Sequence, residues 1–244
     1  GTIDAANNNT GLGVDVFAAL TSGDDNTAVG KGSLTANTTG ANNVAMGSAS
    51  LIANTTGAGN TSVGKGSLAA NTTASNNTAV GFLALLSNTT GTSNTAVGAE
   101  SLDANTTGNS NTAIGIAALS SNTTGGTNFA GGQGALFANT TASNNTGVGY
   151  FALNANTTGA GNTAMGSVAG TAVTTGSNNA LFGYGAADAL TTGTSNTAIG
   201  AFTLSAATAA DENTAVGRAA LTANTSGASN VALGAYALDA NTTA

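Results

Sequence analysis

The sequence contains no cysteine, no histidine and no proline, and only 5% of its 244 residues are charged. Without cysteine or histidine the chain has no disulfide, no zinc site of the usual kind and no imidazole for acid–base chemistry. The basic residues are Lys31, Lys65 and Arg218, and the ten acidic residues bring the net charge to −7. The sequence therefore offers no basic patch for phosphates, and we expect no nucleic-acid partner.

Long apolar runs are also missing. No stretch approaches the ~20 apolar residues that a membrane-spanning helix needs, so we expect no membrane insertion. The chain opens GTIDAANNNT, which is not a signal peptide, and we expect any secretion signal to be removed or to lie outside this piece. No nucleophile is paired with a base, and no pair of carboxylates recurs. The sequence predicts no enzyme, no catalytic residue, no metal and no cofactor.

The sequence does contain a repeat of 17 residues. From Asn26 it reads NTAVGKGSLTANTTGAN, and from Asn43 it reads NVAMGSASLIANTTGAG. Fourteen such units begin with Asn, from Asn9 to Asn230, and each has Gly four residues later. A fixed short period is typical of one supersecondary unit stacked many times. We predict a partial coil at residues 1–8 and a single solenoid of fourteen repeats at 9–244, the last one incomplete.

We call residues at the same place in successive units a column, named after its member in the unit that begins at Asn26. Thr27 and Val29 share one face of a strand, and Ala28 takes the other. β-branched residues and fixed Gly and Asn disfavour a helix. A second strand is expected through SLTANTT, residues 33–39, with Leu34 facing inward. The predicted fold is an all-β parallel β-solenoid of 17-residue coils, with the Val29 and Leu34 columns buried.

Other columns carry more detailed predictions. The Asn26 column is expected to form an amide ladder along the stack. The Ala28 column, almost all Ala, Ser or Gly, indicates close approach of another backbone and a lateral contact. Three units lack Leu in the Leu34 column, and in each an apolar residue replaces the Asn three places later, as if the coil refilled its own interior. These pairs are Phe17 with Leu20, Gly170 with Val173, and Ala187 with Leu190.

The pattern NTAVGxxxLxANTTGxxN resembles the repeats of trimeric bacterial and phage fibre proteins, including those that end in an intramolecular chaperone. It is similar, more distantly, to the NSVAIG-type head repeats of trimeric autotransporter adhesins. The resemblance runs from Asn9 to Ala244. It implies a left-handed parallel β-roll, three chains wound together, and a fibre that projects from a surface and adheres. The adhesin heads have shorter repeats, and no coiled-coil stalk, anchor or chaperone domain is seen here, so the trimer is implied by resemblance alone.

N-x-T/S sequons recur at one place in the coil. They would form a row of glycans if the source glycosylates. The alternative is that NTT is simply favourable turn chemistry. The sequons are at Asn37, Asn54, Asn71, Asn88, Asn105, Asn122, Asn139, Asn156, Asn224 and Asn241.

Two classes of function fit the sequence. The first is a structural or adhesive extracellular or cell-surface fibre that assembles with copies of itself, as a homotrimer or an end-to-end filament, and contacts surface glycans or cells. The second is an ice- or surface-binding solenoid with a regular Thr/Asn array. Thr38 and Thr39 are adjacent and point to opposite faces, which favours the fibre. The apolar residues expected to form the assembly surface are Phe82, Ile116, Phe137, Tyr150, Tyr184, Leu233 and Leu238.

Overall fold

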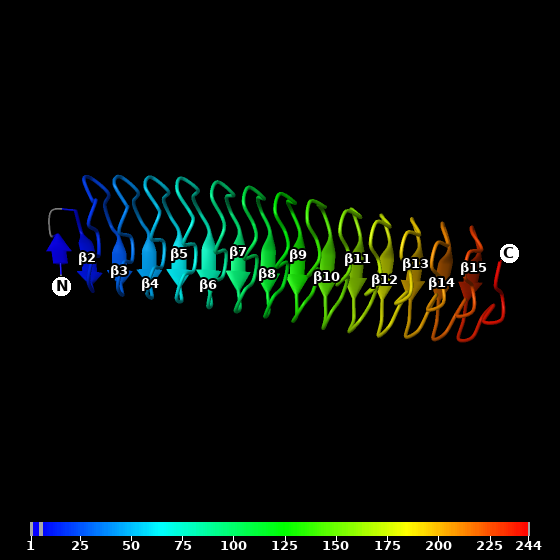
Figure 1. Ribbon diagram of the computed structural model, residues 1–244. Coiled ribbons are helices and arrows are strands. Elements are labelled where there is room, and N and C mark those ends of the chain that lie inside the picture. Colours follow the sequence, from blue (N-terminus) through cyan, green and yellow to red (C-terminus); the bar gives the residue numbers. More distant parts are fainter. Residues whose placement is uncertain (1, 5–6, 244) are drawn as a thin grey trace. The chain divides into compact units, whose positions relative to one another are not determined.

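The computed structural model describes residues 2–4 and 7–243, which form short strands joined by turns and contain no helix (Figure 1). The chain divides into two compact units, Gly1–Thr124 and Gly125–Ala244. The first unit holds β1 (Thr2–Asp4), β2 (Asn9–Leu12), β3 (Thr27–Val29), β4 (Val44–Met46), β5 (Thr61–Val63), β6 (Thr78–Val80), β7 (Thr95–Val97) and β8 (Thr112–Ile114). The second holds β9 (Phe129–Gly131), β10 (Thr146–Val148), β11 (Thr163–Met165), β12 (Ala180–Phe182), β13 (Thr197–Ile199), β14 (Thr214–Val216) and β15 (Val231–Leu233).

Successive strands within each unit pair in parallel, one coil apart. Thr27 of β3 lies opposite Val44 of β4, and Thr146 of β10 lies opposite Thr163 of β11. The exception is β1, which pairs antiparallel with β2. The register equals the sequence period because each coil contributes its strand at the same place. The prediction of an all-β parallel solenoid of 17-residue coils is confirmed.

Each coil contains one strand, so the expected second strand at residues 33–39 is wrong. Residues 31–36 form turns, and the same turns recur in the other coils. The reason is local backbone conformation: Gly32 has φ +71° and Leu34 has φ +49°, both left-handed. Two left-handed residues so close together curl the chain where a strand would extend it. The turns still bond to the next coil, since the Leu34 amide donates to the Ser50 carbonyl at 3.2 Å.

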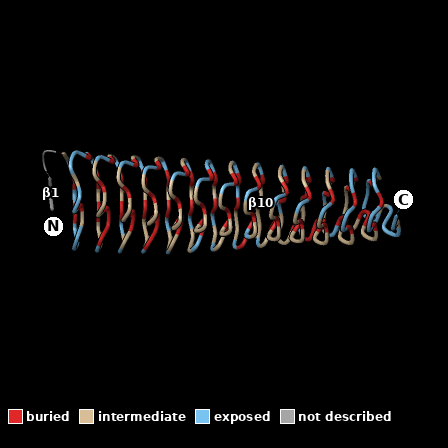
Figure 2. The backbone as a smooth tube through the Cα atoms, turned by 45° about the horizontal axis from the view of Figure 1, so that its top comes forward, coloured by how far each residue is buried: buried red, intermediate tan, exposed pale blue. Residues whose placement is uncertain are grey.

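The core of a coil is narrow and is filled by small side chains and one leucine. Ala28, Ser33 and Leu34 are fully buried, and most of their equivalents in other coils are buried too. Figure 2 shows the same succession of buried, intermediate and exposed segments from coil to coil in each unit. The prediction that the Leu34 column faces inward is confirmed.

The inward and outward faces of the strand are the reverse of those predicted. Ala28 points into its own coil, so the Ala28 column is core and cannot form a lateral contact. The Val29 column points outward; Val80 and Val97, for example, are each 37% exposed. The physical reason is the small volume inside the coil: Leu34 occupies most of it, and only a small residue fits opposite that side chain.

Two ladders of asparagine run through the stacked coils. In the Asn26 column, the Asn43 Nδ2 donates to Asn26 Oδ1 at 3.1 Å and to the Gly57 carbonyl at 2.9 Å. In the Asn37 column, the Asn54 Nδ2 donates to Asn37 Oδ1 at 2.8 Å and to the same Gly57 carbonyl at 2.9 Å. The predicted amide ladder is confirmed, and a second one accompanies it. Together they satisfy buried polar groups that would otherwise be costly.

In the three coils that lack leucine in the Leu34 column, other apolar side chains fill the interior, partly as predicted. Val173 and Leu190 are fully buried, whereas Leu20 is only half-buried. The sequence reasoning missed Leu181, which stands in the Ala28 column and is fully buried. A Cβ added at Gly170 would lie 2.6 Å from Leu181 Cδ1 and 3.4 Å from Val173 Cγ2. Leu181 therefore occupies the space that the missing leucine at position 170 leaves.

Candidate functional site

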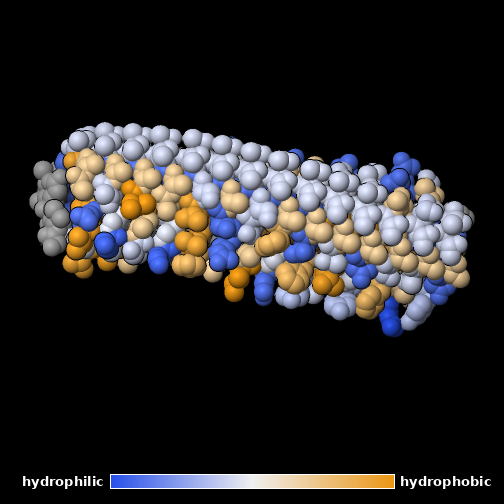
Figure 3. Space-filling view, in the orientation of Figure 1, coloured by the Kyte–Doolittle hydropathy of each residue, from blue (hydrophilic) through white to orange (hydrophobic). Residues whose placement is uncertain are grey.

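The outward face of the strands carries two columns of half-buried or exposed side chains. Thr and Val residues of the Thr27 and Val29 columns alternate with buried residues of the Ala28 column, so both point to solvent. Ile114, Ile199 and Met165 of the Val29 column are 47%, 42% and 44% exposed. In the left half of Figure 3, apolar atoms gather in the lower part of the visible surface and small or polar ones along its upper edge. We call the Thr27 and Val29 columns together the strand face.

The strand face remains apolar where its pattern changes. At β9, Phe129 replaces Thr and Gly131 replaces Val, and a Cβ added at Gly131 would lie 3.2 Å from Phe129 Cε1. The Phe129 ring therefore lies beside the place of the missing valine side chain. At β12 the exchange is opposite, with Ala180 in the Thr column and Phe182 in the Val column. Neither column holds a charged residue in any coil.

A second exposed surface, the turn face, follows the glycine corner that ends each strand. A Cβ added at Gly98 (φ +138°) would lie 2.5 Å from the Gly115 carbonyl oxygen, so this corner must be glycine for the coils to stack. The turn face consists of the Lys31, Gly32 and Thr35 columns, the places in the coil where the sequence varies most. It carries most of the exposed aromatic residues.

The predicted assembly residues are exposed as expected but do not lie on one surface. Phe82, Ile116, Tyr150 and Tyr184 belong to the Lys31 column and Phe137 to the Thr35 column, all on the turn face, and they are 41–57% exposed. Leu233 lies on the strand face and is 79% exposed. Leu238 occupies the place of the buried Leu34 and is 49% exposed, since no coil of the described chain follows it. The strand face itself was overlooked, although the small residues that fill the Ala28 column in every coil but that of Leu181 were a signal that this column faces a narrow interior.

The sequon asparagines form the inner ladder of the Asn37 column. Nine of the ten are fully buried, and Asn241 is half-buried. The side-chain nitrogen that would carry a glycan is used internally: Asn88 Nδ2 donates to Asn71 Oδ1 at 3.0 Å and to the Gly91 carbonyl at 2.9 Å. A glycan on this nitrogen cannot coexist with the folded coil. The buried ladder accounts for the recurring NTT without glycosylation.

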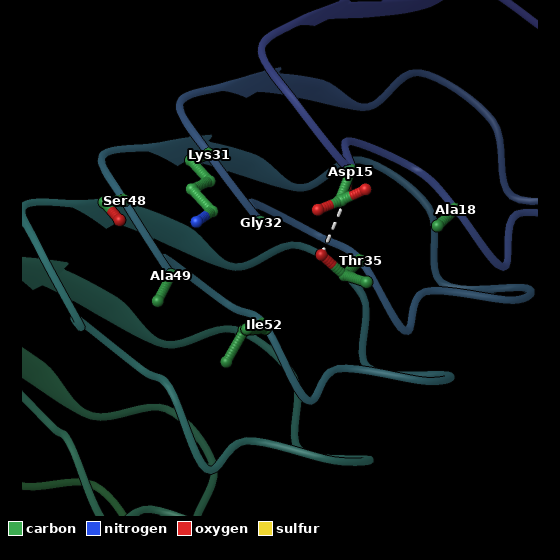
Figure 4. Close-up of a pocket in the computed structure, with 8 residues that line it drawn as sticks. All are labelled: Asp15, Ala18, Lys31, Gly32, Thr35, Ser48, Ala49 and Ile52. Carbon is green, nitrogen blue, oxygen red and sulfur yellow. Dashed lines mark hydrogen bonds between the residues drawn. The ribbon is translucent and has the colours of Figure 1, made fainter.

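A shallow groove of about 380 Å³ opens on the turn face of the first unit. Figure 4 shows that its lining comes from three successive coils, with Asp15 and Lys31 on either side of Gly32. The Thr35 hydroxyl donates to the Asp15 carbonyl at 2.8 Å. The groove exists because Gly32 has no side chain and Ala49 a small one. The charged groups of the groove are the Lys31 ammonium and the Asp15 carboxylate, and they do not form a nucleophile–base pair of the kind found in catalytic sites.

The surroundings of Asp188 shift the pKa of its carboxyl. Burial without a counterion raises the pKa of the Asp188 carboxyl, an effect that hydrogen bonds from its own amide and that of Ala189 only partly offset. Its Oδ1 is buried and has no hydrogen-bond partner. Desolvation of this kind disfavours the charged form of the carboxyl.

The described residues, 2–4 and 7–243, contain no group of three His, Cys, Asp or Glu placed to hold a metal ion. No helix long and apolar enough to cross a membrane occurs among them. Comparison with protein-family models, with curated proteins and with solved structures gave no match to the chain.

Proposed function

We propose that the chain is a structural subunit of an extracellular fibre, in which the strand face packs against the strand faces of other copies. The observation that carries this proposal is the outward Val29 column, which is apolar in every coil except that of Gly131 and whose side chains are exposed or half-buried. A column of outward apolar side chains of this kind, repeated along the strands of each unit, is typical of an interaction site.

The repeat itself favours a second copy as the partner. The apolar side chains recur once per coil, at the ~4.8 Å spacing of parallel strands. A partner stays in register along this surface only if its own side chains recur at the same spacing. Another copy of the chain meets this condition, and because neither column holds a charged residue, contact between two strand faces brings no like charges together. The likeness of the repeat to fibre and adhesin repeats supports three chains per assembly and a location outside the cell.

The test is the association state of strand-face variants. Val80→Lys/Val97→Lys places two ammonium groups on the strand face of neighbouring coils. The matched control, Phe82→Lys/Ala99→Lys, places the same groups in the same coils on the turn face, where lysine already occurs at Lys31. In sedimentation velocity we expect the wild type and the control to associate and the strand-face variant to dissociate. A wild type that stays monomeric at high concentration, or equal association of all three, would contradict the proposal.

Binding to ice or another regular surface is a second candidate, because four successive coils present Thr and an aliphatic residue side by side. These threonines are Thr61, Thr78, Thr95 and Thr112. The earlier objection, that Thr38 and Thr39 point apart, does not apply to this column. The bulky Phe129, Phe182 and Met residues interrupt the array and favour the fibre. Inhibition of ice recrystallisation by the wild type, lost in Thr78→Leu/Thr95→Leu, would instead support ice binding.

A further inference from the structure

The strand face is nearly the same in every coil, so by itself it leaves the register between two copies undefined. In the second unit, Thr occupies the Thr27 column in four of the seven coils, and the Val29 column beside these threonines holds Val, Met or Ile. A copy displaced by one coil along this surface would meet side chains of almost the same size and polarity. Surfaces that repeat in this way specify register weakly. A single register therefore requires coils that differ from their neighbours.

Two coils of the second unit, those of β9 and β12, differ from the regular coils in both columns and carry a ring. One has Phe129 with Gly131, and the other has Ala180 with Phe182. The Phe129 ring covers the place of the side chain that Gly131 lacks, because a Cβ added there would lie 3.2 Å from Cε1 and 3.8 Å from Cζ of that ring. In both coils a ring therefore stands in the Val29 column, and no side-chain tip stands in the other column.

Two copies match these coils when they pack in parallel, each coil on the same coil of its partner. A half turn about the stacking direction brings two strand faces together in this way and places the Val29 column of one copy opposite the Thr27 column of the other. The ring of Phe182 then faces the small side chain of Ala180 in the second copy. Likewise, the ring that covers Gly131 faces the end of the second copy's β9 where no side-chain tip stands. Because the contact is symmetric, every ring meets an open place in both copies.

Other arrangements of two copies lose this match. A displacement by one coil places the Phe182 ring against a threonine, Thr163 or Thr197, instead of an alanine. An antiparallel arrangement, made by a half turn about the strand direction, places the Val29 column against itself. Centred between β10 and β11, this arrangement would set the ring of β12 against the ring of β9. Overlaps and voids of these kinds both reduce the stability of a packed surface.

We infer that Phe129 and Phe182 determine specificity in the fibre contact: they hold two copies in parallel and in register, each coil against the identical coil. The inference rests on the proposed function, which supplies the contact between strand faces. A few residues that break the uniformity of a repeating interface can select one register among many of similar energy. The partner that this surface fits is therefore a second copy of the chain in one orientation and one register.

The role of the rings is tested by restoring the regular pattern in both coils, with Phe129→Thr/Gly131→Val/Ala180→Thr/Phe182→Val. Each change introduces the residue type of the regular coils, so the variant should fold, keep its apolar column and still associate. Slipped copies leave overhanging coils that accept further copies. In sedimentation velocity we therefore expect the wild type to give one boundary and the restored variant to give a range of sizes that increases with concentration.

The matched control is Tyr150→Ser/Phe151→Ala, which removes two rings from the turn face of the same unit and should sediment like the wild type. A restored variant that gives the wild-type boundary overturns the inference and leaves the fibre proposal intact. A restored variant that does not associate also overturns it, since the rings would then supply affinity rather than register. A wild type that stays monomeric overturns the fibre proposal, and the inference with it.

The direction of packing is tested by mixing variants of opposite charge. In the in-register arrangement Val148 of one copy faces Thr146 of the other, so Val148→Lys and Thr146→Glu should associate when mixed. Met165→Glu would face Val148→Lys only in the antiparallel arrangement, and Thr163→Glu only after a slip of one coil. We expect the first mixture to associate about tenfold more tightly than the other two in sedimentation. A preference for either of the others, or equal association of all three, would overturn the inference.

Discussion

The inner asparagine ladder can be tested by making one substitution at two places in the same column. Asn88 lies in the middle of the ladder and makes three side-chain hydrogen bonds, two as donor and one as acceptor from Asn105 Nδ2 at 2.8 Å. Asn156 makes only the two donor bonds, to Asn139 Oδ1 at 2.9 Å and to the Gly159 carbonyl at 3.0 Å. Its Oδ1 is buried without a partner, because the next coil has Val173 in place of the donor.

Asn88→Val is expected to destabilise its coil by about 3 kcal/mol. It removes three hydrogen bonds of about 1 kcal/mol each and leaves Asn71 Oδ1 unpaired at a further cost of about 1–3 kcal/mol. Burial of the valine offsets roughly 1.5–2 kcal/mol of this loss. The Gly91 carbonyl still accepts from Asn77 Nδ2 at 2.9 Å, so it adds nothing to the cost.

Asn156→Val is expected to stabilise its coil by about 0.5–3 kcal/mol. It removes two hydrogen bonds, roughly 2 kcal/mol, but it also removes an unpaired buried oxygen worth about 1–3 kcal/mol. The valine again contributes roughly 1.5–2 kcal/mol. Asn139 Oδ1 keeps a long bond from Asn145 Nδ2 at 3.4 Å, and the Gly159 carbonyl keeps one from the same group at 2.8 Å.

Native-state hydrogen exchange of peptides from each coil measures this difference, because it reports local opening. We expect amides around Asn88→Val to exchange about a hundredfold faster than in the wild type, which corresponds to ~3 kcal/mol. Amides around Asn156→Val should exchange more slowly than in the wild type, by about tenfold for a stabilisation of ~1.4 kcal/mol. Equal effects of the two substitutions would refute the reasoning, since they would show that the ladder's hydrogen bonds do not determine coil stability.

Two further predictions follow from the corner glycines and from Asp188. Gly98→Ala places a Cβ 2.6 Å from the Gly115 carbonyl carbon, whereas a Cβ at Gly32 would lie 3.5 Å from its nearest neighbour. The melting temperature should therefore fall much further for Gly98→Ala than for Gly32→Ala. Because the folded protein raises the pKa of Asp188 above 3.8, the folded state binds the proton more tightly; the contribution of Asp188 to stability is fully present below that value and is lost as pH rises through the folded pKa. Asp188→Asn should abolish this part of the decline in thermal melts across pH, and an unchanged pH profile would contradict the assignment.

The period, the parallel register and the amide ladder were predictable from the sequence because each depends on strict repetition. The face of the strand that points inward could not be predicted in this way. Val29 is the more apolar residue, but Ala28 is the one small enough for the narrow interior of the coil. Hydrophobicity alone favours burial of the Val29 face, whereas the available volume favours burial of the Ala28 face. In a coil with so narrow an interior, the available volume determines the orientation. The left-handed Leu34 was equally hidden, since leucine has no local preference for that conformation. The strand face was missed because the inward side of the strand had been assigned wrongly. The exposure of the aromatic residues was predicted correctly because it does not depend on how the strand packs.

The two asparagine ladders have a consequence for how such a chain can change its length. Within the regular stretch, a coil offers the following coil the same donors and acceptors that it receives from the preceding one. A whole coil can be gained or lost there by recombination between copies of its coding sequence, and the new junction is as well bonded as the old. Between Val173 and Ala207 the inner ladder is replaced by apolar residues, and a gain or loss there would bring unmatched interiors together. Changes in length should therefore accumulate in the regular coils and spare this segment.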